Sequence, residues 1–106
     1  MNGITEKQFA TQVESLLSIF QWRWCHFRPA RTKHGWTTAM SGHPGFPDYI
    51  AVKGERLLAV EIKSEKGKVT PEQMAWLDAF QEAGAETFLW RPSDSDFAVT
   101  KLRGVE

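Results

Sequence analysis

The sequence predicts a mixed α/β fold, in which a small central β-sheet of mixed strand direction is flanked by helices. Two segments with helical periodicity stand before and after a pair of apolar strands, and a further strand follows the second helix. The order helix, strand, loop, hairpin, helix and strand is typical of a small mixed sheet with helices packed on it. With 106 residues, the chain is expected to form one domain, residues 1–106, around a single core.

The first expected helix carries an apolar stripe near the N-terminus. Residues at helical spacing make up this stripe: Phe9, Val13, Leu16, Leu17 and Phe20. Thr5 followed by Gln8 fits a capping box at the start of the helix. Glu14 lies outside the stripe but next to Val13, so we expect its carboxylate at the edge of the buried face.

The next segment is an expected strand followed by a long loop. Residues 22–28 alternate as a strand does, with Trp22, Trp24 and His26 on one side, although the alternation leaves open which side is buried. Residues 29–47 contain three prolines and three glycines and show no periodicity. Loops of this length in compact domains are usually functional or mobile, so we expect a substrate-facing or partner-facing loop with a short strand around residues 36–40.

Two apolar strands follow, at residues 48–53 and 56–63, and only Gly54 and Glu55 separate them. That spacing predicts a tight hairpin. Because side chains alternate along a strand, Glu61 and Lys63 are expected on the same face.

The last expected elements are a second helix and a short strand. Thr70, Pro71 and Gln73 supply a capping box with proline at the first helical position, and Gly84 fits the stop. Residues 87–90 then read as a strand, followed by a turn at residues 91–96.

Composition excludes several classes of protein. Hydrophobic residues make up 42% of the chain and charged residues 25%, which is typical of a soluble globular protein. No stretch approaches the roughly 18 apolar residues of a membrane span. The N-terminus lacks the features of a secretory signal, and the single Cys25 can form no internal disulfide. A cytoplasmic protein with no membrane association is therefore expected.

Charge is distributed unevenly although the formal net charge is zero. Residues 15–47 contain no aspartate or glutamate, and a basic face there would hold a nucleic-acid backbone. Lysines in the turn after the second strand of the hairpin could also contact phosphates. A solvated surface is an equally good interpretation of both groups. The candidate DNA-binding residues are Arg23, Arg28, Arg31, Lys33, Lys66 and Lys68.

Asp48, Glu61 and Lys63 carry the main chemical signal. Two carboxylates held close together repel each other unless a cation lies between them or one is protonated. Mg²⁺ prefers oxygen ligands and is commonly bound by one or two carboxylates together with substrate phosphates. With a lysine alongside, the set suits hydrolysis of a phosphodiester. The alternative is a same-face ion pair on an exposed strand, worth about 0.5 kcal/mol.

The motifs around these residues resemble a known nuclease family. Pro47-Asp48, twelve intervening residues and then EIK at residues 61–63 resemble the core motif of the PD-(D/E)xK nuclease superfamily. Within that superfamily, GFPD at residues 45–48, the short hairpin and QxxWL at residues 73–77 are similar to the VRR-NUC family. The resemblance implies a restriction-endonuclease-like core and a Mg²⁺- or Mn²⁺-dependent DNA endonuclease.

The resemblance also implies roles for individual residues and partners. Lys63 would position or activate the attacking water, and Gln73 would contact water, Lys63 or the scissile strand. Isolated domains of this family are associated with cleavage of branched DNA, such as Holliday junctions, and with homodimers, so both are expected here. The implied metal ligands are Glu14, Asp48, Glu61 and the backbone carbonyl of Ile62.

Other interpretations stay open at this point. The chain could be a flap or nicking nuclease without junction specificity, or a non-catalytic nucleic-acid-binding or protein-interaction module of the same fold. The spacing of the three histidines matches no common zinc motif. The five tryptophans suit either base stacking or packing in a core or interface.

Overall fold

The computed structural model describes residues 3–27, 30–32, 35–37 and 40–104. The mixed α/β fold is confirmed: a four-stranded sheet has the strand order β1-β4-β5-β6, and β2 and β3 form a separate two-stranded sheet. The elements in chain order are α1 (Glu6–Ile19), β1 (Arg23–His26), β2 (Ala30–Thr32), β3 (Gly35–Thr37), β4 (Tyr49–Lys53), β5 (Arg56–Ile62), α2 (Pro71–Glu82), β6 (Glu86–Trp90), η1 (Pro92–Asp94) and α3 (Ser95–Arg103).

Strand pairing in the main sheet is mixed. β1, β4 and β5 are antiparallel neighbours, whereas β6 runs parallel to β5 after the connection through α2. The expected two-residue hairpin joins β4 to β5, and Gly54 adopts the positive φ of 60° that its turn requires. Tyr49 pairs with Val60, so Asp48, one residue earlier, comes opposite Glu61.

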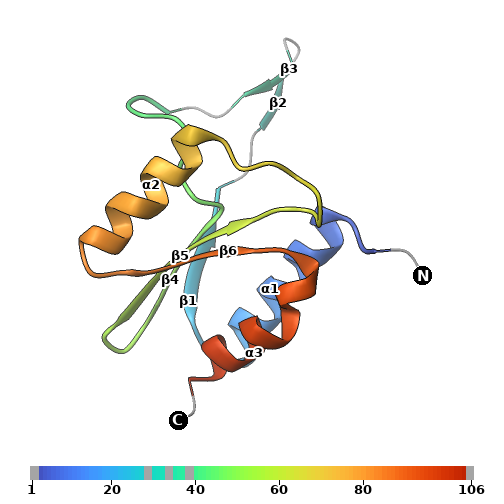
Figure 1. Ribbon diagram of the computed structural model, residues 1–106, viewed down its shortest axis with the longest axis vertical. Coiled ribbons are helices and arrows are strands. Elements are labelled where there is room, and N and C mark those ends of the chain that lie inside the picture. The colour runs from blue at the N-terminus through green and yellow to red at the C-terminus, as the bar shows by residue number, and fades with distance from the viewer. Residues whose placement is uncertain (1–2, 28–29, 33–34, 38–39, 105–106) are drawn as a thin grey trace.

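The helices lie on both faces of the main sheet. Figure 1 shows α1 and α3 together on one side and α2 on the other. The main core lies between the sheet and the pair α1 and α3, because apolar residues of those elements are buried there. Its buried members are Phe9, Val13, Leu17, Trp22, Tyr49, Ala51, Leu58, Val60, Ile62, Trp90, Ala98 and Leu102.

The expected features of the first two elements are confirmed, and the open question about β1 is answered. The capping box of Thr5 and Gln8 begins α1. Trp22 is buried in the main core, and Trp24 packs against that core, so this side of β1 faces inward. Trp24 also donates a hydrogen bond from its indole to Ser18 on α1.

The prediction for residues 29–47 was partly wrong. The segment does not form a continuous loop with one strand at residues 36–40, because β2 at residues 30–32 and β3 at residues 35–37 pair in antiparallel fashion. Strands of three residues are too short to show the alternation by which a strand is recognised in sequence.

The C-terminal helix α3 was not predicted, and the expected turn at residues 91–96 contains η1 and the first turn of α3. Only Ala98 and Leu102 of α3 are buried, and they lie four positions apart on one face of this short helix. The end of α3 is also held by distant residues. The Trp22 indole donates to the Leu102 carbonyl at 2.8 Å, and Arg56 donates to the Lys101 carbonyl at 2.9 Å.

Among the described residues, none of the helices has the length and apolar character needed to cross a membrane.

Candidate active site

Asp48, Glu61 and Lys63 meet where β4 begins and β5 ends. Asp48 accepts a hydrogen bond from the backbone N–H of Ile62 at 2.7 Å, which fixes its carboxylate beside β5. The Lys63 ammonium lies 3.7 Å from Glu61 Oε2, so the two side chains share one face as expected. The chain at Lys63 is held in turn by β6, because the Lys63 N–H donates to the Trp90 carbonyl at 3.0 Å.

Glu61 is an acidic residue in a buried position, where an ionised side chain is unfavourable. Its side chain is almost fully buried, and its Oε1 atom has no hydrogen-bond partner. Burial raises the pKa of Glu61 from 4.5 to about 8, and the charge of Asp48 adds to the rise while Lys63 opposes it. Without a cation between the two carboxylates, Glu61 therefore holds a proton near neutral pH.

These observations fit a site for a hard divalent cation. The donors are carboxylate oxygens, and the unpartnered Glu61 oxygen is buried beside a second carboxylate, which is costly unless a cation is bound or Glu61 is protonated. Mg²⁺ and Mn²⁺ prefer such oxygen donors. Within the described residues, no group of three or more histidine, cysteine, aspartate or glutamate side chains is arranged to hold a metal ion. The protein's side-chain contribution there is thus the pair Asp48 and Glu61.

Glu14 lies elsewhere. Its carboxylate accepts a hydrogen bond from the Tyr49 hydroxyl and lies 3.1 Å from Nδ1 of His26. Tyr49 pairs with Val60 and points into the main core, on the face opposite Glu61. The structure therefore does not bring Glu14 into the acidic pair, and its role as a metal ligand stays a prediction. Tyr49 and His26 were missed as its partners, although the sequence shows Tyr49 directly after Asp48 and His26 on the same side of its strand as Trp22 and Trp24.

Comparison with known proteins places the chain in a family. The sequence profile of the VRR-NUC domain matches residues 13–93. The chain belongs to the VRR-NUC domain family. A solved structure of a "VRR_NUC domain protein" has a TM-score of 0.63 and 21% identity, over 95% of this chain and 92% of that chain. No curated protein matches the chain. The fold of this VRR-NUC domain is nuclease-like, and its acidic pair consists of Asp48, directly before β4, and Glu61 on β5.

Gln73 caps a helix in this VRR-NUC domain. Its side-chain oxygen accepts a hydrogen bond from the Thr70 N–H at 2.9 Å, and its own N–H donates to the Thr70 hydroxyl at 3.1 Å. This capping box was expected and begins α2. The same contacts turn the Gln73 oxygen toward its own helix, so an additional role toward water or substrate stays a prediction.

The basic residues expected to hold DNA are only partly described. Arg23 is exposed on β1, and Lys66 and Lys68 are exposed in the turn after β5. Arg28 and Lys33 lie outside the described residues, as does the side chain of Arg31. DNA binding by these residues stays a prediction.

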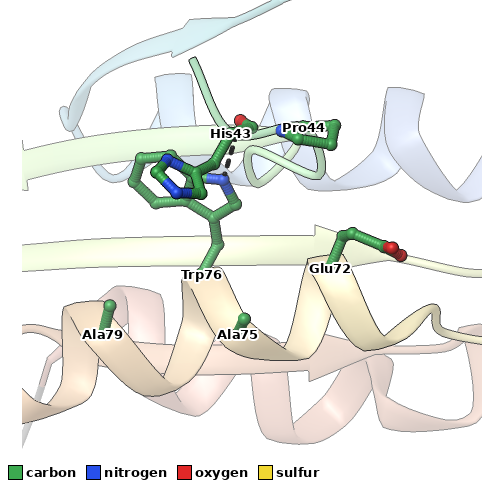
Figure 2. A pocket seen from close by; sticks show the side chains of 6 residues that line it. All are labelled: His43, Pro44, Glu72, Ala75, Trp76 and Ala79. Atoms are coloured by element: carbon green, nitrogen blue, oxygen red, sulfur yellow. Dashed lines mark hydrogen bonds between the residues drawn. The ribbon is translucent and has the colours of Figure 1, made fainter.

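A pocket of about 280 Å³ lies beside α2, next to the segment that leads to Asp48. Figure 2 shows Trp76 reaching from α2 toward His43, and the indole donates a hydrogen bond to the His43 carbonyl at 3.2 Å. None of Asp48, Glu61 and Lys63 lines this pocket, so the pocket is separate from the candidate active site. The pocket's lining residues are His43, Pro44, Glu72, Ala75, Trp76 and Ala79.

Gly45 fixes the same segment against α2. Its φ is 93°, and a Cβ at this position would come within 2.7 Å of the backbone carbon of Glu72. The positive φ favours glycine, and the backbone of α2 cannot move aside as a flexible side chain could. Gly45 therefore allows the chain to pass α2 closely on its way to Asp48.

Replacing Gly45 by alanine is expected to lower the free energy of unfolding by roughly 1 to 3 kcal/mol, from backbone strain together with the clash. Gly42→Ala is the matched control, because Gly42 has a similar φ of 101° but open space where a Cβ would stand. Urea denaturation of both variants gives the comparison. An equal loss of unfolding free energy in the two variants would show that the clash of the added Cβ with α2 contributes nothing.

Proposed function

We propose that this VRR-NUC domain is a metal-dependent DNA endonuclease that hydrolyses phosphodiester bonds at Asp48, Glu61 and Lys63. The observation that carries the proposal is the buried pair of opposed carboxylates, with one Glu61 oxygen unpartnered and a lysine 3.7 Å away. A structural ion pair does not need the second carboxylate, whose charge raises the pKa of Glu61. The arrangement makes sense if a cation binds between the carboxylates.

Mg²⁺ or Mn²⁺ is the proposed cofactor. Asp48, Glu61 and the backbone carbonyl of Ile62 would hold it, and Glu14 is a weaker candidate because its carboxylate contacts Tyr49 and His26. When bound, a divalent cation polarises a phosphate and makes water a stronger nucleophile. Binding would also displace the proton that Glu61 otherwise retains, because the cation favours the ionised carboxylate.

Lys63 would act directly on the reacting groups. Its side chain is 15% exposed and its ammonium lies beside the acidic pair, so the charged group sits between a buried site and the surface. From this position Lys63 would orient the attacking water and stabilise the negative charge that develops on the phosphate. Two hydrogen bonds hold Asp48 and Lys63 in place relative to each other. The Lys63 N–H donates to the Trp90 carbonyl, and the Ile62 N–H donates to the Asp48 carboxylate.

The proposed substrate is DNA, and branched DNA such as a Holliday junction is the proposed preference. The resemblance to isolated VRR-NUC domains supports this preference. A homodimer would suit it, since two sites related by two-fold symmetry can cut opposing strands of a symmetric junction. The exposed cations Arg23, Lys66 and Lys68 are the described candidates for contacts with the DNA backbone.

Cleavage assays with labelled DNA test the proposal. The chain is incubated with Mg²⁺ or Mn²⁺ and with junction, flap, splayed and linear duplex substrates, and light scattering at low concentration reports the oligomeric state. We expect cleavage that needs the metal and is fastest on the junction. Equal cleavage of flap or linear DNA would favour a nuclease without junction specificity. Binding without cleavage in either metal would favour a non-catalytic module.

A further inference from the structure

Several hydrogen bonds hold the turn that follows Lys63 in place. Residues 64–67 connect the end of β5 toward α2, and the Gly67 N–H donates to the Ser64 carbonyl at 3.2 Å. The turn is also tight at Gly67, because the Cβ of any other residue there would lie 2.9 Å from the Ser64 hydroxyl. The turn is therefore compact and begins directly at the proposed active site.

The Arg91 side chain, which follows β6, donates hydrogen bonds to the backbone of this turn. Its Nη1 atom donates to three backbone carbonyls, those of Ser64 at 2.7 Å, Glu65 at 3.2 Å and Gly67 at 2.7 Å. Arg91 follows β6 directly, next to Trp90, whose carbonyl accepts from the N–H of Lys63. One guanidinium thus binds the turn at three points and ties it to the neighbouring strand.

A second contact supports the first. The Glu65 carboxylate accepts hydrogen bonds from the Ser93 N–H at 3.1 Å and from the Ser93 hydroxyl at 2.7 Å. Bonds to charged groups are stronger than bonds between neutral ones. Arg91 and Ser93 together therefore fix the turn to the segment after β6.

Two lysines, one inside this turn and one directly after it, have no partner in the described part of the chain. Lys66 and Lys68 are exposed, and within the residues that the structure describes neither ammonium has an ion pair or hydrogen bond. Both follow Lys63 closely in the chain. A turn of fixed shape, with one unpaired cation inside it and another directly after it, is suited to holding phosphates beside the proposed active site.

We propose that Arg91 is a positioning residue that holds residues 64–67 in the form in which Lys66 and Lys68 contact the phosphates of bound DNA. This inference rests on the proposed nuclease function. Arg91 is half-buried, and its guanidinium is directed to backbone carbonyls. It acts on DNA through the turn, whereas Lys66 and Lys68 make the contacts.

A double-mutant cycle on DNA binding tests the inference. Dissociation constants for a labelled duplex are measured with Ca²⁺ in place of Mg²⁺, between 50 and 200 mM salt. The variants are Arg91→Ala, the pair Lys66→Ala with Lys68→Ala, and all three together. Loss of two phosphate contacts lowers the salt slope by about 2, which shrinks the change in affinity over that salt range about tenfold. We expect Arg91→Ala to reproduce most of this effect and to add little in the variant without both lysines.

Arg103→Ala is the matched control, because Arg103 is an exposed arginine in the last turn of α3, away from the turn. It should leave the salt slope nearly unchanged. Arg91→Lys keeps the charge but lacks the guanidinium, so it should lie between the parent and Arg91→Ala. This milder variant also serves if Arg91→Ala does not fold.

Two results would overturn the inference. Additive effects of Arg91→Ala and the lysine pair would make Arg91 an independent DNA contact. An unchanged salt slope in folded Arg91→Ala would show that Arg91 contributes to the stability of the fold and not to DNA binding. The parent chain is also assayed for cleavage in Mg²⁺, which separates the two levels of the proposal. Cleavage by the parent together with additivity rejects only the role of Arg91, whereas a parent that neither binds nor cuts DNA rejects the nuclease function and this inference with it.

Discussion

Replacing Lys63 by alanine is expected to lower kcat for DNA cleavage by about two to four orders of magnitude, the contribution typical of a proton-transfer or charge-stabilising group. The reason is its position: the ammonium lies 3.7 Å from Glu61, between the acidic pair and the surface. Single-turnover cleavage in saturating Mg²⁺ or Mn²⁺ measures the chemical step without the contribution of product release.

Two further variants make this experiment specific. Lys63→Arg keeps a positive charge but cannot release a proton, so substantial rescue would show that Lys63 acts by charge alone. Lys7→Ala removes an exposed lysine from α1 and should cut DNA at the parent's rate. If Lys63→Ala cuts as fast as the parent chain, the active site has been assigned to the wrong residues.

Replacing Glu61 by glutamine is expected to stabilise the metal-free protein at pH 8 while abolishing cleavage. Glu61 is buried beside Asp48, and its pKa in the folded protein is raised to about 8 from 4.5. A raised carboxyl pKa means that the folded state keeps a proton that the unfolded state releases. The free energy of unfolding should therefore fall as the pH rises from 4.5 to 8 and level off above that range.

The size of this effect follows from the pKa shift. At 1.36 kcal/mol per pKa unit, the shift of Glu61 amounts to at most about 5 kcal/mol. The difference in unfolding free energy between the parent and Glu61→Gln reports this contribution together with the coupling of Glu61 to Asp48. Urea denaturation in EDTA at several pH values supplies the data. Glu55→Gln is the control, because Glu55 is an exposed glutamate in the turn between β4 and β5.

A parallel pH dependence in the parent and in Glu61→Gln would contradict the electrostatic description of the site. The same variants can be measured with Mg²⁺, which should stabilise the parent by mass action and leave Glu61→Gln nearly unaffected.

The acidic site could be predicted from sequence because its geometry depends on local rules. A two-residue turn fixes the register of β4 and β5, and the register places Asp48 opposite Glu61. Alternation along β5 then puts Lys63 on the face of Glu61. The capping boxes of α1 and α2 could also be predicted from the sequence, because each depends on two residues only three positions apart.

The rest depends on contacts between segments that are distant in sequence. Helix α3 is held by Trp22 and Arg56, which lie far from it in the chain, and only two of its own residues, Ala98 and Leu102, are buried. The partners of Glu14 come from β1 and β4, so its helical position alone could not show where the carboxylate points. Arg91 resembles any other surface arginine until the turn at residues 64–67 is seen beside it.

The proposal that Asp48 and Glu61 form a divalent cation site is tested most directly by calorimetric titration of Mn²⁺ into the DNA-free protein. The parent chain, Asp48→Asn and Glu61→Gln are compared at pH 8, where Glu61 is about half protonated and the cation competes with less than one proton there. We predict saturable binding to the parent that is lost or weakened at least about tenfold in each variant. Equal binding by all three proteins would contradict the assignment of this site.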